Sequence, residues 1–251
     1  MDHPCLKLNS TLDRYQEAHL WLHMMEIEYH NADPFRWYLN VFLKALNEVP
    51  NLIAMELQNH PGFPKWFRHH RQRLGSDPLI HALSKGRDRV VHKKMLIPKS
   101  RAAVGITEGR GMKLGFGMNI NPLQDSDHGM HCYLAAGDFF DILMPDEDSL
   151  PCVQREWRLP DFDEELIDLC SRAWERVGVT LADVLKWLGE DIPPLILSCR
   201  RSHQAVRFKT YNRATLRKWL TEMQTIPSNP TADGHLNLKR DRLFGPESGH
   251  K

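Results

Sequence analysis

The strongest constraint on the fold is a stripe of apolar residues that runs through residues 34–59 at helical spacing. Its members are Phe35, Tyr38, Leu39, Phe42, Leu46, Val49, Ile53 and Leu57. This 3.6-residue period predicts one long amphipathic helix. Pro34 suits its first turn, where the missing N–H costs nothing, and Pro50 should kink it because a proline removes a backbone hydrogen bond.

Two further long helices are predicted to pack against this one. Residues 10–30 repeat apolar and aromatic side chains at the same period, with Ser10 or Thr11 as the N-cap. A short link joins this helix to the next, which favours an antiparallel pair. Residues 162–189 hold the period until Gly189, a natural helix C-cap.

The middle of the chain has the two-residue period of β-strands. Met112, Leu114, Phe116 and Met118 alternate with polar residues and glycines. Val104 and Ile106 should pair with them across a turn at 108–111, which gives a hairpin. A phosphate-binding loop is less suitable there because no helix follows the turn. Residues 145–161 are expected to be irregular or extended, residues 205–211 form a C-terminal strand, and a helix is expected from 125 to about 144.

Composition excludes several classes of protein. The 33 basic and 32 acidic residues nearly balance, so no global field attracts the chain to nucleic acid or membranes, and such attraction must come from local patches. The five cysteines are scattered and lack C-x-x-C spacing, which fits a reducing compartment. We find no apolar run of about 20 residues, the length of a membrane span, and no signal peptide. We therefore expect a cytoplasmic protein without membrane contact.

Residues 76–92 form a helix that carries a compact set of chemistry-capable side chains. Ser76 should cap it, with Asp77 in its first turn. Arg87 lies in the middle of the apolar face, where an arginine is rare unless it is paired or set in an interface. Asp88 follows directly and His92 comes five residues after the arginine.

The set suits RNA cleavage, because RNA carries its own nucleophile, the 2′-OH. His92 could act as general acid or base near neutral pH. Arg87 could bind the phosphate and stabilise the developing charge, while Asp88 orients His92 or an arginine of a partner. The expected product is a 2′,3′-cyclic phosphate, formed without a metal or cofactor.

Two basic stretches are candidate RNA contacts. The first has Lys65, Arg68, Arg71 and Arg73 around Trp66 and Phe67, and cations interleaved with aromatics can bind phosphates and stack on bases. The alternative is a helix that docks by its aromatics and keeps its charges in water. The second stretch, residues 200–218, is an accessory basic surface or a solvated face.

A weaker alternative is a metal site at His128 and His131, which are three residues apart and follow Asp125. A metal site needs further ligands that the fold would have to supply. A polar helix start explains the same residues, and no metal is expected.

The helical chain with R-x-x-x-x-H near the end of a central helix resembles the HEPN superfamily, with the motif at Arg87–His92 and a polar residue, Asp88, after the arginine. The resemblance covers residues 8–95 and 160–190. It implies a homodimer in which the two motif helices meet. Many members are metal-independent RNases of toxin–antitoxin or phage-defence systems, and others are inactive binding or assembly modules.

We therefore expect a mainly α fold, a HEPN-like helical bundle at 8–190 with a β-hairpin insertion at about 98–125. A basic appendage at 191–224 and a flexible tail at 225–251 follow. The expected function is a metal-independent endoribonuclease that binds RNA and an antitoxin. The alternative is a non-catalytic binding or regulatory protein with Arg87 as an interface anchor.

Two observations limit the enzyme hypothesis. The same spacing recurs at Arg14 and His19, so spacing alone does not identify a site. Residues five apart on a straight helix diverge by roughly 140°, so Arg87 and His92 converge only if the helix ends near Val91 or across a dimer.

Overall fold

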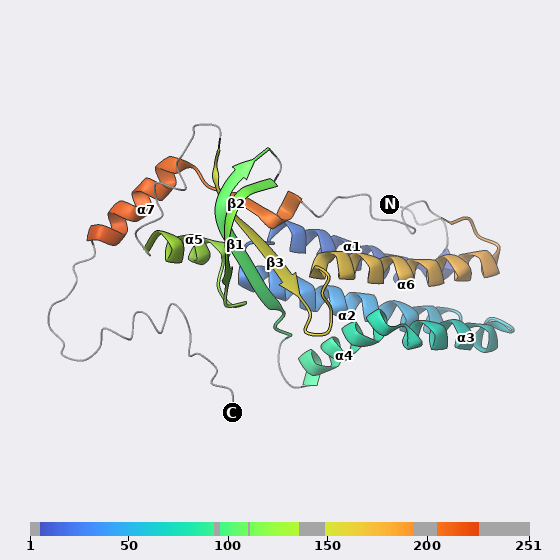
Figure 1. The fold of residues 1–251 in the computed structure, drawn as a ribbon. Coiled ribbons are helices and arrows are strands. Elements are labelled where there is room, and N and C mark those ends of the chain that lie inside the picture. Colours follow the sequence, from blue (N-terminus) through green and yellow to red (C-terminus); the bar gives the residue numbers. More distant parts are fainter. Residues whose placement is uncertain (1–5, 93–95, 110, 136–148, 193–204, 226–251) are drawn as a thin grey trace, which may run out of the picture.

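The structure is a computed structural model that describes residues 6–92, 96–109, 111–135, 149–192 and 205–225 (Figure 1). For residue 6 and for residues 86–92 and 224–225 it describes the backbone alone. The helices are α1 (Asn9–Ile27), α2 (Ala32–Glu56), α3 (Phe63–Ser76), α4 (Pro78–His92), α5 (Ser126–Ala135), α6 (Leu166–Leu188) and α7 (Arg213–Thr225). The strands are β1 (Lys99–Glu108), β2 (Gly111–Asn119), β3 (Pro151–Arg158) and β4 (Phe208–Thr210), and 3₁₀ turns precede α1 and β4.

The expected mainly α, HEPN-like bundle with a hairpin is wrong, because the protein has a mixed α/β fold. The four strands of the described residues form one antiparallel sheet in the order β2-β1-β3-β4. The predicted hairpin is only half of this sheet. Strand β3 lies at its centre, within the stretch for which the sequence predicts an irregular or extended chain. The sequence signal of β3 is weak because Arg155 occupies a core-facing position and interrupts the apolar alternation.

The three long helices are confirmed and build the larger of two hydrophobic cores. Helices α1 and α2 lie side by side, and α6 packs along them (Figure 1). The predicted C-cap of α6 is also confirmed, since Gly189 has a left-handed φ of 75°. Helices α3 and α4 complete this core from the side of α2.

Two predicted N-caps are wrong in detail. The helix predicted to start at Ser76 is capped by Asp77, whose Oδ1 accepts from the amides of Leu79 and Ile80, and Ser76 ends the preceding helix. The carboxylate of Glu56, at the end of α2, accepts from the amides of Ser10 and Thr11 at the start of α1. In both places a carboxylate bonds the free amides more strongly than a hydroxyl does.

The predicted hairpin forms, and in it Val104 lies opposite Phe116 and Ile106 opposite Leu114. Gly109 makes the turn with a left-handed φ of 58°. Gly105 must be glycine because a Cβ there would lie 1.7 Å from the carbonyl oxygen of Leu114.

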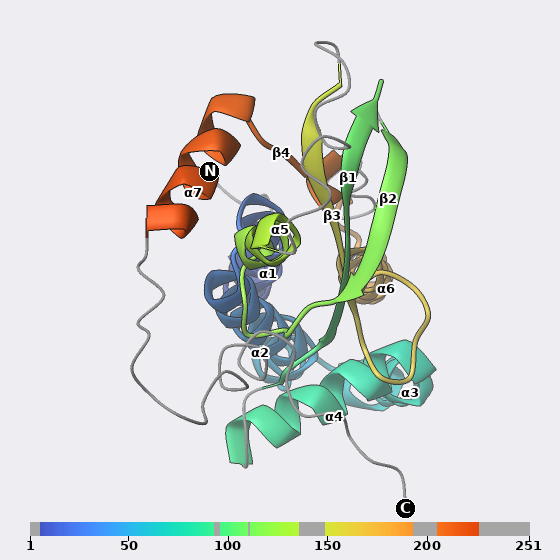
Figure 2. The ribbon, with the colours of Figure 1, turned by 60° about the vertical axis from the view of Figure 1, so that its left-hand side comes forward.

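One face of the sheet packs against both cores. Figure 2 shows α5, α1 and α2 on this side of the strands. Along β3, Val153 enters the smaller core with α5 and α7, and Trp157 enters the larger helical core. Arg155 lies between them on the same face and is fully buried.

A reciprocal pair of hydrogen bonds joins Tyr29, just after the end of α1, to the sheet. The indole N–H of Trp157 donates to the carbonyl oxygen of Tyr29, 2.9 Å away. The Tyr29 hydroxyl lies 2.9 Å from the carbonyl oxygen of Arg155 and 3.0 Å from Oε1 of Glu165. Burial, and then the Glu165 carboxylate, raise the pKa of Tyr29, so the phenol stays a donor.

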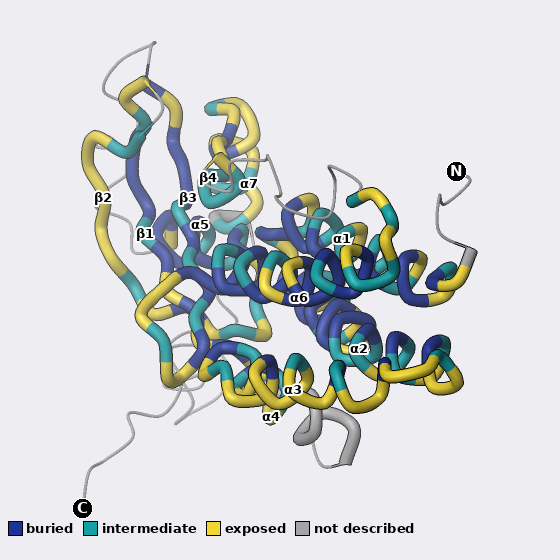
Figure 3. The backbone as a smooth tube through the Cα atoms, turned by 90° about the vertical axis from the view of Figure 1, so that its right-hand side faces the viewer, coloured by how far each residue is buried: buried dark blue, intermediate teal, exposed yellow. Residues whose placement is uncertain are grey.

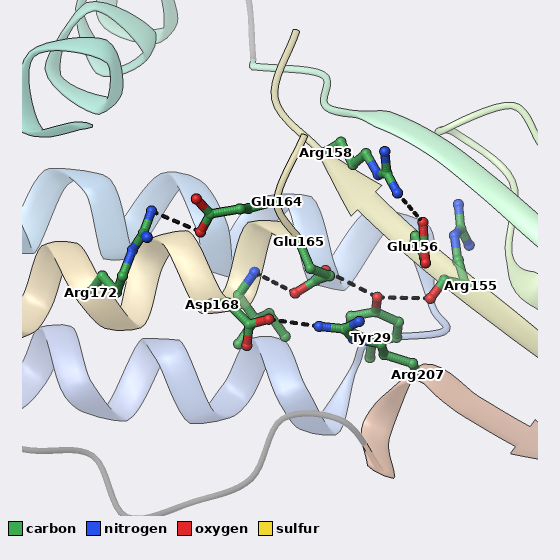
Figure 4. A network of polar contacts seen from close by, with 10 residues as sticks. Tyr29, Arg155, Glu156, Arg158, Glu164, Glu165, Asp168, Arg172 and Arg207 are labelled. Atoms are coloured by element: carbon green, nitrogen blue, oxygen red, sulfur yellow. Dashed lines mark hydrogen bonds and ion pairs between the residues drawn. The ribbon is translucent and has the colours of Figure 1, made fainter. Parts of the chain in front are cut away.

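Glu165 connects these hydrogen bonds to α6. Its side chain caps the helix by accepting from the amide of Ile167 at 2.8 Å. One turn later, Asp168 accepts from Arg207 at 2.6 Å, which ties the turn before β4 to the same place (Figure 4). One small polar network therefore connects α1, α6, β3 and the segment leading into β4.

Replacing Tyr29 by phenylalanine should lower the free energy of unfolding by about 1–3 kcal/mol, because the buried oxygens of Arg155 and Glu165 lose the one hydroxyl proton that lies between them. Urea denaturation followed by circular dichroism measures this change. Tyr38→Phe is the control, since its ring stacks on Trp21 and it is only partly buried. Equal effects of the two substitutions would contradict the assigned role of the Tyr29 hydroxyl.

Candidate nucleic-acid interface

The four predicted cations of α3 do not lie on one surface. Arg71 reaches α2, where its Nη2 donates to Oδ1 of Asn51 at 2.8 Å. Arg73 turns the opposite way and lies 3.0 Å from Asp183 of α6. Arg68 lines a cavity with Arg71, and Lys65 is exposed like the three arginines.

The aromatic side chains between these cations mostly dock the helix, as the alternative interpretation predicts. Phe67 is buried in the larger core. The ring of Trp66 is 4.0 Å from that of His70 and 5.6 Å from that of Trp187 on α6. Trp66 is therefore used in packing α3 on α6.

Two cavities lie on either side of Arg71. One, of about 210 Å³, is lined by Ala54, Gln58, Phe63, Pro64, Phe67, Arg68 and Arg71. The other, of about 280 Å³, is lined by Asn47, Pro50, Asn51, Arg71, Leu74, Gly75, Ile80 and Ser84. We call the two cavities together the Arg71 groove. It combines an apolar floor with arginine and amide side chains.

The Arg71 groove carries net positive charge. None of the described residues that line it is acidic. Its polar side chains bond one another: besides the Arg71–Asn51 bond, the Ser84 hydroxyl donates to Oδ1 of Asn47 at 2.6 Å. Within the described residues no carboxylate neutralises Arg68 or Arg71, so both cations can receive an anion.

Arg73 has a different environment although it is only two residues from Arg71. Asp183 lies within 3.0 Å of Arg73 and within 3.5 Å of His70. Burial and the neighbouring Arg73 lower the pKa of His70, which favours the neutral imidazole. This flank of α3 belongs to its contact with α6 and not to the groove.

The three candidate catalytic residues all lie on α4, whose backbone is helical through His92. Positions 87 and 88 are one turn beyond Ser84, so they continue the side of the helix that lines the groove. Positions 87 and 92 are roughly 140° apart on this helix. One chain therefore does not bring Arg87 and His92 to the same face, and the side chains of 86–92 are outside the described part.

The proposed metal residues have separate partners. His128 on α5 is 3.4 Å from the sulfur of Cys132, and the ring of His131 is 4.0 Å from that of Trp219. Asp125 accepts from the amide of Ala32 at 2.6 Å. Among the described residues no group of three or more His, Cys, Asp or Glu side chains has the arrangement of a metal site.

Most of the described cations of the second basic stretch are paired. Lys209 lies 2.5 Å from Asp127, Arg207 bonds Asp168, and Arg213 donates to the carbonyl oxygen of Ser149. Arg200 and Arg201 lie outside the described residues. These bonds hold β4 and α7 onto the protein, which is a structural use of the charge. The helices of the described chain include none long and apolar enough to cross a membrane.

A second polar cluster, which the sequence patterns did not indicate, lies between the two cores. Arg155 donates from Nε to Ser100 at 2.9 Å, and its guanidinium carbon lies 3.8 Å above the ring of Trp157. Its two terminal nitrogens have no hydrogen-bond partner among the described residues. Burial lowers its pKa to about 9. Because Arg155 is fully buried, it serves the packing of the two cores.

His30 is part of the same cluster. Its Nδ1 is 2.8 Å from the Ser126 hydroxyl, and Nε2 is buried without a hydrogen-bond partner in the described structure. Burial, with the nearby charges of Lys209 and Arg155, lowers its pKa to about 4. His30 is therefore neutral in the folded protein at neutral pH.

Comparison with known proteins finds a similarity to a phage protein family. A family model described as bacteriophage lambda protein ea47 matches residues 3–108, which run from before α1 to the end of β1. The match covers the α3 cations and the whole of α4, and its description names no activity. The searches of curated proteins and of solved structures return no significant match.

The low pKa of His30 predicts that acid destabilises the protein. Above pH 6.5 the imidazole is neutral in both the folded and the unfolded state. Between pH 6.5 and about 4 only the unfolded chain takes up the proton, so the free energy of unfolding decreases as the pH is lowered. Over this range the free energy of unfolding decreases by about 3 kcal/mol in total. Urea midpoints measured across this range should vary less in His30→Asn. His81→Asn, at an exposed position, is the control and should keep the wild-type dependence of the urea midpoint on pH. Equal pH profiles for wild type and His30→Asn would contradict the assignment of the acid effect to His30.

Proposed function

We propose that this protein binds single-stranded RNA in the Arg71 groove. The observation that carries the proposal is the contrast between Arg71 and Arg73. One faces a cavity free of acidic side chains among the described residues, and the other is neutralised by Asp183. A cation left unneutralised beside a cavity is suited to receive an anion.

The composition of the groove favours a nucleotide chain over a free anion. The cavity beside Arg68 has Phe63, Phe67 and Pro64 in its wall, which suits the flat apolar face of a base. Arg68 and Arg71 at its rim suit the flanking phosphates. Asn47, Asn51 and Ser84 in the second cavity offer donors and acceptors to base edges or to a 2′-OH.

Removing the two groove arginines should weaken RNA binding by about tenfold or more, because each arginine makes a charge-assisted hydrogen bond with a phosphate. Fluorescence anisotropy with a labelled single-stranded RNA measures the affinity of Arg68→Ala/Arg71→Ala. The slope of log affinity against log salt should also become shallower, by about 0.7 for each phosphate that the variant no longer neutralises.

Arg73→Ala is the matched control, since it removes the same charge from the same helix. It should change RNA affinity by less than about twofold, because Asp183 already neutralises Arg73. A DNA oligonucleotide of the same sequence tests the 2′-OH contacts. Equal losses of affinity in Arg73→Ala and in the double variant, or no RNA binding by wild type, would refute RNA binding in the Arg71 groove.

RNA cleavage is the second candidate function. The continuous helix α4 determines which of its candidate residues could act at the same phosphate. Arg87, Asp88 and His92 lie one to two turns beyond Ser84, close to where bound RNA would leave the groove. Because positions 87 and 92 do not share a face, cleavage requires residues from two chains, with Arg87 of one and His92 of the other at one phosphate. This arrangement would suit a toxin or phage-defence nuclease.

A shared site predicts complementation between inactive variants. Cleavage should survive EDTA, give 2′,3′-cyclic phosphate ends, and be abolished in both Arg87→Ala and His92→Ala while RNA binding persists. Mixing the two variants should restore part of the activity, because a mixed dimer keeps one intact site. Electrophoresis of end-labelled RNA measures the result, and RNA left intact by the wild-type protein would leave binding as the function.

A further inference from the structure

Strand β2 is an open edge of the sheet. It pairs with β1 on one side, and on its other side no described strand lies next to it. In an antiparallel strand every second residue directs its N–H and C=O away from its neighbour, so β2 presents a row of free backbone groups. Figure 3 shows β2 as an exposed strand at the margin of the molecule.

This edge is apolar and nearly uncharged. Leu114 is 43 % exposed and Phe116 is 39 % exposed, although both continue the face of Val104 and Ile106 that packs on α5. Lys113 is the only charged residue of the strand. Natural edge strands usually carry charges, prolines or bulges that prevent pairing. In β2 the charge and the register shift both lie at Met112–Lys113, next to the hairpin turn, and residues 114–119 have none of these devices.

The sequence of β2 is complementary to itself about Gly115. When two copies run antiparallel with Gly115 facing Gly115, Leu114 lies opposite Phe116, within the part of β2 that pairs regularly with β1. The two copies of Lys113 lie at opposite ends of this contact, so no like charges meet. The apolar face of one sheet continues directly into that of the other.

Gly117 supports a close neighbour at this edge. Its φ is not positive, and a Cβ built on it would meet no atom within 4 Å. The single chain therefore gives no reason for a glycine at 117. The close approach of a second backbone at this edge does.

We propose that two copies of this chain associate through β2 in this antiparallel register, which joins their sheets into one of eight strands. The contact is two-fold symmetric and uses the one long open edge of each described sheet, so it closes at the dimer. This surface differs from the α4 contact that RNA cleavage requires. The inference also stands apart from RNA binding, which uses α2, α3 and α4.

Charge substitutions at Leu114 and Phe116 test both the surface and the register. Wild type should have twice the chain mass in sedimentation equilibrium and in size exclusion with light scattering. Leu114→Lys alone and Phe116→Glu alone should each be monomeric, because each places a charge against an apolar side chain of the partner. The double variant L114K/F116E should return to the dimer, because each lysine then faces a glutamate.

An equimolar mixture of the two single variants gives a further check, because it can form only one cross-strand ion pair and should be partly dimeric. Val179→Lys, which adds the same charge at an exposed residue of α6, should stay dimeric. Circular dichroism confirms that each variant is folded. A monomeric wild type, a dimer unaffected by Leu114→Lys, open-ended polymers, or a double variant that stays monomeric would overturn the proposal.

Discussion

The structure depends on the exchange of hydrogen bonds between Tyr29 and strand β3. The indole of Trp157 donates to the backbone carbonyl of Tyr29. The hydroxyl of Tyr29 in turn lies within hydrogen-bond distance of the backbone of β3 and of Glu165. Because all of these groups are buried, breaking any of these bonds would leave an unpaired polar group in an apolar setting. These hydrogen bonds fix the end of α1 against the centre of the sheet. The larger helical core and the smaller sheet core can then share one strand, with Arg155 filling the seam over the Trp157 ring.

Sequence periodicity predicts the elements in which apolar residues recur regularly at the buried positions. The long helices and the hairpin belong to this class, because most of their core-facing residues are apolar and recur at helical or strand spacing. Strand β3 does not, since a cation stands at one of its inward positions, and β4 is only three residues long. Without these two strands the chain looks like a helical bundle. The stacking of Arg155 on Trp157 is a tertiary interaction that no local pattern indicates, and it is the reason why periodicity alone predicts the wrong fold class.

The candidate site shows the same limit at the level of single residues. Arg71 and Arg73 are equivalent in the sequence, which predicts RNA binding for both. Their difference arises from Asn51 and Asp183, which α2 and α6 bring to opposite flanks of α3. Asn47, Asn51 and Ser84 escape sequence reasoning because isolated polar residues on predicted helices carry no distinctive spacing. The Arg87–His92 motif is recognised by its spacing, yet the continuity of α4 separates the two positions in one chain. Charge counts along a helix thus identify a basic surface, and only the packing decides which cations remain available.

The order of the elements along the chain has a consequence for synthesis. The apolar side of the α1–α2 pair is covered by α6, which follows the whole β1–β3 region. During translation the two first helices therefore leave the ribosome with Leu22, Phe42 and their neighbours unburied, and they remain so until most of the chain has been made. Such an intermediate is prone to aggregation, and the sheet edge at β2 emerges within the same period. Chaperone demand of this protein should consequently depend on how fast the ribosome reaches α6, and less on the stability of the finished fold.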